Sequence, residues 1–207
     1  MRRKSNYDKY KGEYIFVLDR SGSMSGKRIE QAKKALILFL KSLPENSKYN
    51  IISFGSNFER MYPESLLYND ENVEKTIYEI ESFDANFGGT EICMPLLDIV
   101  QKDKQMSNYL RNVILLTDGQ VHNSENVIQI LGLMKQNNVG VTHMVGIGDG
   151  VSFDMIKRGA KNSGGEHMFI MKNEEMQRQI IYLLESITKC AVGKFNLEYN
   201  QKLIECT

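Results

Sequence analysis

The stretch YIFVLDRSGSM, residues 14–24, joins an apolar run to a short loop of polar side chains. Tyr14–Leu18 is apolar throughout, which is typical of a strand buried on both faces of a sheet. The following loop places a carboxylate at Asp19 and hydroxyls at Ser21 and Ser23, on alternate positions that project to one side of an extended segment. A loop of this kind between a strand and a helix predicts a ligand site at the edge of a parallel sheet.

The alternation of buried strand and amphipathic helix continues along the chain. Further apolar runs bounded by turn residues predict strands over Tyr49–Phe54, Asn112–Thr117, Val139–Ile147 and His167–Met171. Apolar residues at three- and four-residue spacing predict helices over Lys27–Leu43, Asn72–Ser82, Ile92–Lys102, Ser124–Asn137, Phe153–Ser163 and Glu174–Cys190. This alternation predicts an α/β, doubly wound (Rossmann-like) fold, with a mostly parallel sheet of about six strands and helices on both faces.

The ends of the chain and one hairpin complete the predicted organisation. Phe58–Met61, directly after a Gly-Ser-Asn turn, predicts one short antiparallel edge strand. Residues 1–12 are interpreted as a polar linker and residues 13–192 as the single domain. Lys194–Ile204 alternates as a strand does, so residues 193–207 are interpreted as a C-terminal extension in which a following β domain could start.

The bulk composition excludes several classes of protein. A chain of 207 residues with 42% hydrophobic and 25% charged residues is typical of one globular domain, not of a disordered or membrane protein. Lysine and arginine number 26, as do aspartate and glutamate, so no net charge favours binding to nucleic acid. No apolar stretch reaches the roughly 18 residues that span a bilayer, so no membrane span is expected.

The cysteines and the first residues predict the compartment. Cys93, Cys190 and Cys206 lie far apart, without the pairing of metal-binding cysteines or the density of a disulfide scaffold, so we expect reduced thiols. The start MRRKSNYDKYKGEY lacks the apolar core of a signal peptide. Both features favour the cytoplasm. We expect this domain to be part of a larger multidomain chain. A signal peptide upstream in that chain would instead imply secretion.

Two further loops are expected at the same sheet edge, because loops after the carboxyl ends of parallel strands gather there. Asp118-Gly119 follows one predicted strand, and Gly88-Gly89-Thr90 brings a hydroxyl to a helix start. The predicted ligands are five oxygen-bearing side chains, Asp19, Ser21, Ser23, Thr90 and Asp118. The set suits Mg²⁺, which prefers about six oxygen ligands. Mn²⁺ is the alternative, Ca²⁺ wants more ligands, and Zn²⁺ would recruit Cys or His.

These motifs resemble a known family. The D-x-S-x-S run, the later Thr90 and the T-D-G at Thr117 to Gly119 are similar to the metal-ion-dependent adhesion site of von Willebrand factor type A domains. The resemblance covers roughly Glu13 to Ala191. More narrowly, YIFVLDRSGSM, KSLPENSKYNIISFGS, GGTEI and GIGDG resemble the corresponding segment of inter-α-trypsin inhibitor heavy chains and of the vault poly(ADP-ribose) polymerase.

The resemblance implies a role for each predicted ligand. Ser21 and Ser23 would bind the metal directly, and Thr90 directly or through water. Asp19 and Asp118 would bind partly through bridging waters. A Glu or Asp of a partner protein would complete the coordination shell.

Three functions are open at this point. A metal-dependent interaction module that is not an enzyme is favoured, because no nucleophile with an activating base stands at recognisable spacing. A Mg²⁺-dependent hydrolase or phosphotransferase would need a base, and His122 is expected to be a solvated loop residue. The third is a structural module of a larger assembly, with incidental metal.

Arg20 is expected to be a surface charge that points away from the metal, or alternatively to reinforce binding of an acidic partner.

Two glycine-containing loops differ from nucleotide-binding motifs. Gly22 to Lys27 has its second glycine one residue early for a phosphate loop, with Arg28 where Ser or Thr would bind Mg²⁺. Gly146-x-Gly148-x-Gly150 has Val151 in place of the third glycine of a dinucleotide fingerprint. Nucleotide binding is therefore not expected, and the second loop is interpreted as a turn.

Overall fold

The computed structural model describes residues 11–102, 109–121 and 123–204, with side chains as far as Thr188. Its strands are β1 (Gly12–Asp19), β2 (Lys48–Phe54), β3 (Phe58–Arg60), β4 (Leu66–Leu67), β5 (Leu110–Thr117), β6 (Val141–Ile147) and β7 (His167–Ile170). Its helices are α1 (Lys27–Lys41), α2 (Asp70–Glu81), α3 (Cys93–Lys102), α4 (Ser124–Gln136), α5 (Phe153–Ser163) and α6 (Asn173–Ile204). Each strand and helix predicted up to residue 192 is present, with shifts of a few residues at some ends, except that the last helix continues well beyond Cys190.

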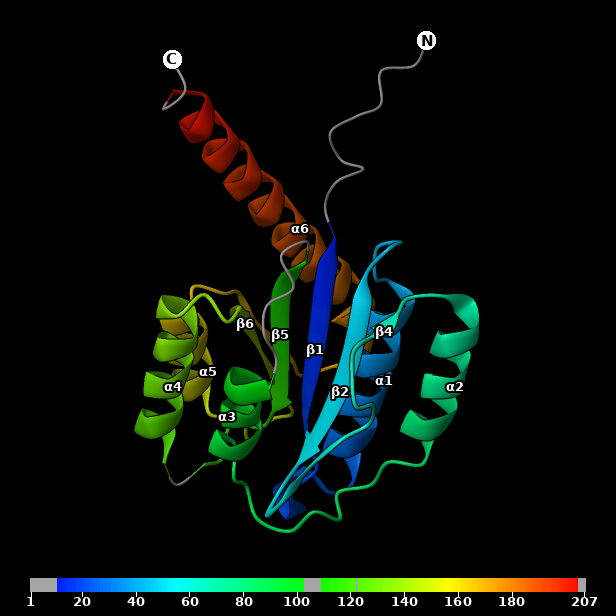
Figure 1. Ribbon diagram of the computed structural model, residues 1–207. Helices are drawn as coiled ribbons and strands as arrows, with labels where there is room; N and C mark the ends of the chain where they lie inside the picture. Colours follow the sequence, from blue (N-terminus) through cyan, green and yellow to red (C-terminus); the bar gives the residue numbers. More distant parts are fainter. Residues whose placement is uncertain (1–10, 103–108, 122, 205–207) are drawn as a thin grey trace.

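Among the described residues, seven strands form one sheet in the order β3-β2-β1-β5-β6-β7, with β4 also pairing with β2 (Figure 1). Strands β1, β2, β5, β6 and β7 run parallel, while β3 and β4 are antiparallel to β2. The predicted mostly parallel, doubly wound sheet is therefore confirmed. It has more strands than expected because Leu66–Leu67, too short for a periodicity to show, adds a second antiparallel piece.

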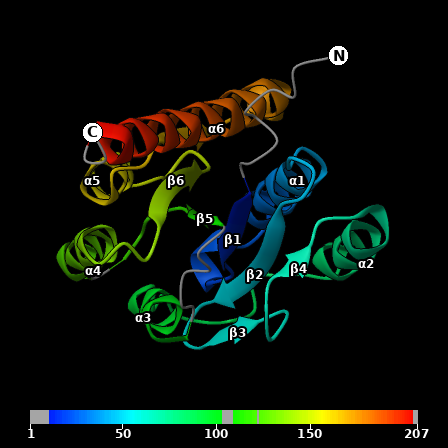
Figure 2. The same cartoon turned by 45° about the horizontal axis from the view of Figure 1, so that its top comes forward.

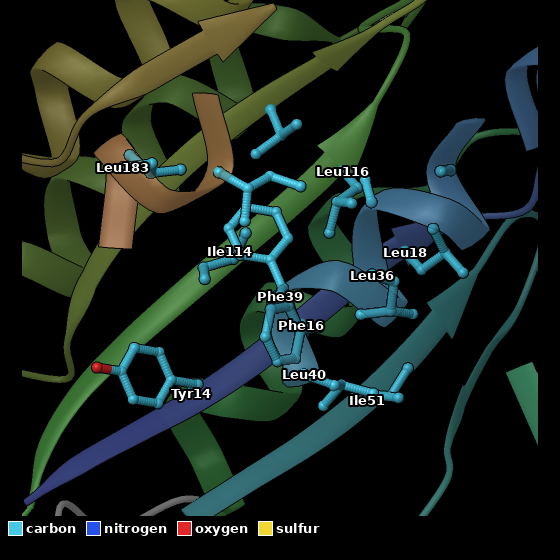
Figure 3. Packing of buried hydrophobic residues seen from close by; sticks show 14 of the residues in the cluster. Tyr14, Phe16, Leu18, Leu36, Phe39, Leu40, Ile51, Ile114, Leu116 and Leu183 are labelled. Atoms are coloured by element: carbon cyan, nitrogen blue, oxygen red, sulfur yellow. The ribbon is translucent and has the colours of Figure 1, made fainter. Parts of the chain in front are cut away.

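Each face of the sheet is covered by its own helices, as Figure 2 shows. One core packs against α1, α2 and α6, and the other packs against α3, α4 and α5. Strand β1 is buried on both sides, so Phe16 faces the first core and Val17 the second, as the period of two in a strand requires. In the first core the rings of Phe16 and Phe39 lie 5.7 Å apart (Figure 3).

The strand expected over Lys194–Ile204 is wrong, because α6 continues as a helix from Asn173 to Ile204. Apolar residues in a short window fit both periods, and no proline stands between residues 173 and 204 to end the helix. Gly193 alone does not stop it, since one glycine inside a helix costs only about 1 kcal/mol. The proposed domain limits and the start of a following domain stay predictions. None of the helices in the described residues is long and apolar enough to cross a membrane.

Candidate metal centre

The pairing of β1 with β5 brings two of the predicted ligands to one edge of the sheet. Leu18 pairs with Leu116, so Asp19 and Thr117 end their strands side by side, and Asp118 follows directly. The Thr117 hydroxyl donates a hydrogen bond of 2.5 Å to Asp19 Oδ2. Adjacent strands thus place the carboxylates of Asp19 and Asp118 close enough for the Asp118 charge to raise the pKa of the Asp19 carboxyl.

The loop after β1 arranges its two serines with its carboxylate. Backbone N–H of Ser21 donates to Asp19 Oδ1 at 2.9 Å, and the hydroxyl oxygens of Ser21 and Ser23 are 3.1 Å apart. A short 3₁₀ turn at Gly22–Met24 holds this arrangement, and the fully buried side chain of Met24 fixes the turn to the core. Local sequence therefore creates a compact group of three side-chain oxygen donors.

Both carboxylates are fully shielded from solvent. Burial raises the pKa of the Asp19 carboxyl above its ordinary value; the Asp118 charge adds to the rise, while hydrogen bonds from Ser21 and Thr117 oppose it. Asp118 Oδ1 accepts the backbone N–H of Gln120 at 3.0 Å. Two neighbouring buried carboxylates are costly unless cations offset them, which is an environment suited to a bound metal.

The third loop, which carries Thr90, is attached to the first by backbone hydrogen bonds. Gly22 N–H donates to Gly88 O at 2.7 Å, and Phe87 N–H donates to Arg20 O at 3.0 Å. Gly88 has a φ of +80°, which favours glycine there. The structure therefore joins Thr90's loop to that of Asp19, Ser21 and Ser23, and the Thr90 side chain is half-buried beside it.

Arg28, which is not among the predicted ligands, lies among these loops. Its Nη1 donates to Asp118 Oδ2 at 3.0 Å and to Ser23 O at 2.8 Å. The loop after β6 makes room for it: a Cβ on Gly148 would lie 2.8 Å from Arg28 Cγ, and one on Gly150 2.5 Å from Arg28 Nη2. One signal could have revealed this residue, because a cation in the first turn of a helix is unfavourable unless an anion compensates it.

The expectation that Arg20 is a surface charge is wrong. Its residue is only 8% exposed, and its guanidinium lies between two aromatic rings, 4.3 Å from the centre of Phe83 and 4.4 Å from that of Phe87. Nε donates to Asp84 O at 2.8 Å and Nη2 donates to Asn86 Oδ1 at 2.9 Å. Arg20 does point away from the ligand side chains, but it packs the segment that leads to Thr90.

The donor set fits a hard divalent cation. All the predicted ligands offer oxygen, and two of them are carboxylates, which is the chemistry that Mg²⁺ and Mn²⁺ prefer. In the part of the chain that the structure describes, no three His, Cys, Asp or Glu residues gather as a soft-metal site would need. Cys93 is a free thiol, as expected, whereas the side chains of Cys190 and Cys206, and all of His122, lie outside the described residues.

A family profile and the similar proteins agree on one family for this chain. A family profile for the von Willebrand factor type A domain matches residues 12–169. A von Willebrand factor A domain-containing protein of Dictyostelium discoideum is 41% identical over 91% of this chain and 20% of its own length. The von Willebrand factor A domain-containing protein 5A of Rattus norvegicus is 36% identical over 94% of this chain and 24% of its own length. The chain thus spans about a quarter or less of these relatives.

Solved structures agree on the fold. A von Willebrand factor type A protein from Catenulispora acidiphila superposes with a TM-score of 0.73 at 16% identity, covering 84% of this chain and 42% of the other. Proximal thread matrix protein 1 from the mussel byssus, with a zinc-occupied MIDAS motif, gives 0.67 at 15% identity, covering 83% and 45%. Manganese-loaded TRAP protein from Plasmodium vivax gives 0.63 at 16% identity, covering 84% and 74%. At these identities the likeness concerns the fold alone.

Proposed function

Because the chain belongs to the von Willebrand factor type A domain family, we propose that it is a metal-ion-dependent protein-interaction module and not an enzyme. The residues that would hold the cation are Asp19, Ser21, Ser23, Thr90 and Asp118. Mg²⁺ is the first choice and Mn²⁺ the second, and the bound ion would supply an electrophilic position for an Asp or Glu of a partner protein. Two structural neighbours with this fold hold zinc and manganese.

One observation carries the proposal: two solvent-shielded carboxylates lie next to paired hydroxyls where the first and fifth strands end. The Asp118 charge contributes to the raised pKa of the Asp19 carboxyl, and the hydroxyls of Ser21 and Ser23 are 3.1 Å apart beside Asp19. Hydroxyl ligands add no negative charge, so a divalent ion held by them stays attractive to an external carboxylate. Arg28 offsets one of the two buried negative charges, and a bound cation would offset the other.

The hydrolase alternative has less support from the described residues. His143 is 4% exposed and lies inside the sheet, where its Nδ1 accepts Glu166 N–H at 3.0 Å and its Nε2 is 3.4 Å from Asn112 Oδ1. His167 lies on the edge strand β7 and is exposed. Neither is hydrogen-bonded to a hydroxyl or thiol that could act as a nucleophile. We therefore keep binding as the proposed function.

Calorimetric titration of Mg²⁺ into the purified domain tests the metal site. We expect saturable binding by the wild type and none by the double variant Asp19→Ala, Ser21→Ala. Ser25→Ala is the matched control, because this exposed serine stands in the same loop but is not a predicted ligand. Absence of binding by the wild type, or equal binding by the double variant, would rule out the proposed site.

The partner and the cellular setting belong to the whole protein. Capture of a partner from cell extract that is lost in EDTA and in the double variant would support metal-dependent docking. Capture that persists unchanged in EDTA would instead favour a structural module with incidental metal. A cytoplasmic location, and the narrower kinship with inter-α-trypsin inhibitor heavy chains and the vault polymerase, remain part of the proposal. The full-length gene product would test both.

A further inference from the structure

Arg28 is a third charged group in direct contact with the candidate metal centre. It stands in the first turn of α1, and its Nη1 bridges Asp118 Oδ2 at 3.0 Å and Ser23 O at 2.8 Å. The Arg28 side chain is 28% exposed, whereas that of Asp118 is fully buried. An ion pair with one buried partner is weakly screened by solvent, so the guanidinium charge acts strongly on the site.

The charges of these groups can be counted directly. Asp19 and Asp118 together carry two negative charges when ionised, and Arg28 offsets one of them. With a divalent cation bound, the net charge of the two carboxylates and the ion would be zero. Arg28 would raise this net charge to plus one. A net positive site attracts an anionic group, whereas a neutral one has only local polarisation to offer. Arg28 therefore decides the sign of the loaded site.

The surroundings of Arg28 favour its staying in place beside a bound ion. Asp118 has two carboxylate oxygens, and only Oδ2 contacts Arg28. A second anchor, Ser23 O, does not involve a carboxylate at all. Gly148 and Gly150 give the side chain its space, since a Cβ at either position would come within 2.8 Å of it.

We propose that Arg28 is the specificity-determining residue of the site: it weakens the hold on the metal and strengthens the hold on a carboxylate of the partner. The inference rests on the proposed function, because it presupposes that the five predicted ligands bind a cation. It goes further in assigning the preference for an acidic partner to one residue outside that ligand set. A residue that only braced the two loops would affect both affinities in the same direction.

Two measurements on a set of charge variants test this inference. Arg28→Gln removes the charge but keeps N–H donors, and Arg28→Met is a second neutral variant. Arg28→Lys keeps the charge but loses the planar set of N–H donors of the guanidinium. Lys27→Gln is the matched control, because it removes one charge from an exposed neighbour in the same helical turn. Melting curves recorded in EDTA establish that each variant is folded before it is titrated.

The first measurement is the affinity for Mg²⁺ alone, by calorimetry. A unit charge a few ångströms from a divalent ion repels it, so we expect Arg28→Gln and Arg28→Met to bind Mg²⁺ about ten-fold more tightly than the wild type. Arg28→Lys and Lys27→Gln should remain within about two-fold of it.

The second measurement uses acetate as the carboxylate probe and Mn²⁺ as the ion. Mn²⁺ bound to the protein broadens the methyl proton signal of acetate that reaches it, so a titration followed by NMR reports the affinity for the carboxylate. We expect this affinity to fall several-fold in Arg28→Gln and Arg28→Met, and to be retained in Arg28→Lys and Lys27→Gln.

The outcomes separate this inference from the function on which it rests. A wild type that binds neither Mg²⁺ nor Mn²⁺ overturns both. A wild type that binds metal, with neutral variants that bind it equally or more weakly, overturns the role of Arg28 and leaves the interaction module standing. Unchanged acetate affinity in the neutral variants does the same. The result that supports the inference is a higher affinity for Mg²⁺ together with a lower affinity for acetate in the neutral variants.

Discussion

The hydroxyl of Thr117 donates to Asp19 Oδ2 and at the same time accepts the backbone N–H of Gly119 at 2.9 Å. It thereby links the end of β5 to the carboxylate at the end of β1. We expect Thr117→Val to weaken Mg²⁺ binding by about ten-fold or more, because groups that orient a metal ligand have effects of that size. Calorimetry measures it, and unfolding in urea should show a loss of about 1–2 kcal/mol.

Thr142→Val is the control for that substitution. Thr142 is fully buried in the neighbouring strand β6, and its hydroxyl has no hydrogen-bond partner among the residues that the structure describes. The same change of hydroxyl to methyl should therefore leave metal affinity unaltered and stability equal or higher. If both valine variants lose the same metal affinity, Thr117 has no special role in orienting Asp19.

Asp19→Asn should stabilise the metal-free protein and abolish its response to metal. Burial and the nearby Asp118 raise the pKa of the Asp19 carboxyl. A raised folded-state pKa means that ionised Asp19 costs stability, and this cost grows as the pH rises through the ordinary value and is complete above the folded-state pKa. A neutral amide removes the cost near neutral pH, and each kcal/mol corresponds to about 2–4 °C in a chain of this size.

Thermal melting with EDTA and with Mg²⁺ provides the measurement. The wild type should melt higher with Mg²⁺, since a ligand that binds only the folded state stabilises it. Asp19→Asn should melt higher than the wild type in EDTA and show no further rise with Mg²⁺. A variant that melts lower than the wild type in EDTA contradicts the idea that the two carboxylates strain the metal-free site.

Arg20→Ala should destabilise the domain by about 2–3 kcal/mol, from two lost hydrogen bonds and the lost contact with two rings. Arg20 donates to the backbone oxygen of Asp84 and to the side-chain Oδ1 of Asn86, in the segment that leads to Thr90, so we also expect weaker Mg²⁺ binding. Urea unfolding measures the first effect. Lys34→Ala is the control, because it removes an exposed positive charge from α1. It should change stability by less than about 0.5 kcal/mol.

If Arg20 instead reinforces binding of an acidic partner, Arg20→Ala should lose partner binding but keep its stability and its metal affinity. An Arg20→Ala protein of unaltered stability and metal affinity would restore that alternative.

Because His143 is buried, we expect the domain to lose stability in mild acid. Burial lowers the pKa of His143 to about 4 from an ordinary 6.5. The unfolded chain therefore takes up a proton first as the pH falls below about 6.5, and stability present above that value is lost progressively towards pH 4. Between about pH 7 and pH 5 we expect a loss of about 2 kcal/mol, measured by urea unfolding.

The two histidines provide the comparison for this pH effect. His143→Gln, which keeps a donor towards Asn112, should lose most of the pH dependence in this range. His167→Gln, at an exposed position, should retain it. A His143→Gln variant whose stability still falls by the wild-type amount would assign the pH dependence to other groups.

Much of the fold could be predicted because burial imposes a period. Tyr14–Leu18 is apolar at every position since both faces of β1 are covered, and α1 shows an apolar stripe since only one face is. The failures fall where that signal is short or ambiguous. Leu66–Leu67 is too short to show a period, and it is recognised as a strand only by its pairing with β2. Residues 194–204 suit either period, and with no proline to end it α6 continues through them.

The sequence by itself determined the set of predicted oxygen ligands and the strand ends on which they stand, because spacing along a strand and its loop is a local property. Only the tertiary structure decided the charge of the site and the place of Arg20. Arg28 lies 90 positions from Asp118 in the chain, and Arg20 lies more than 60 positions from Asp84 and Asn86. Contacts between side chains so far apart depend on how strands and loops pack in space, which no local pattern records.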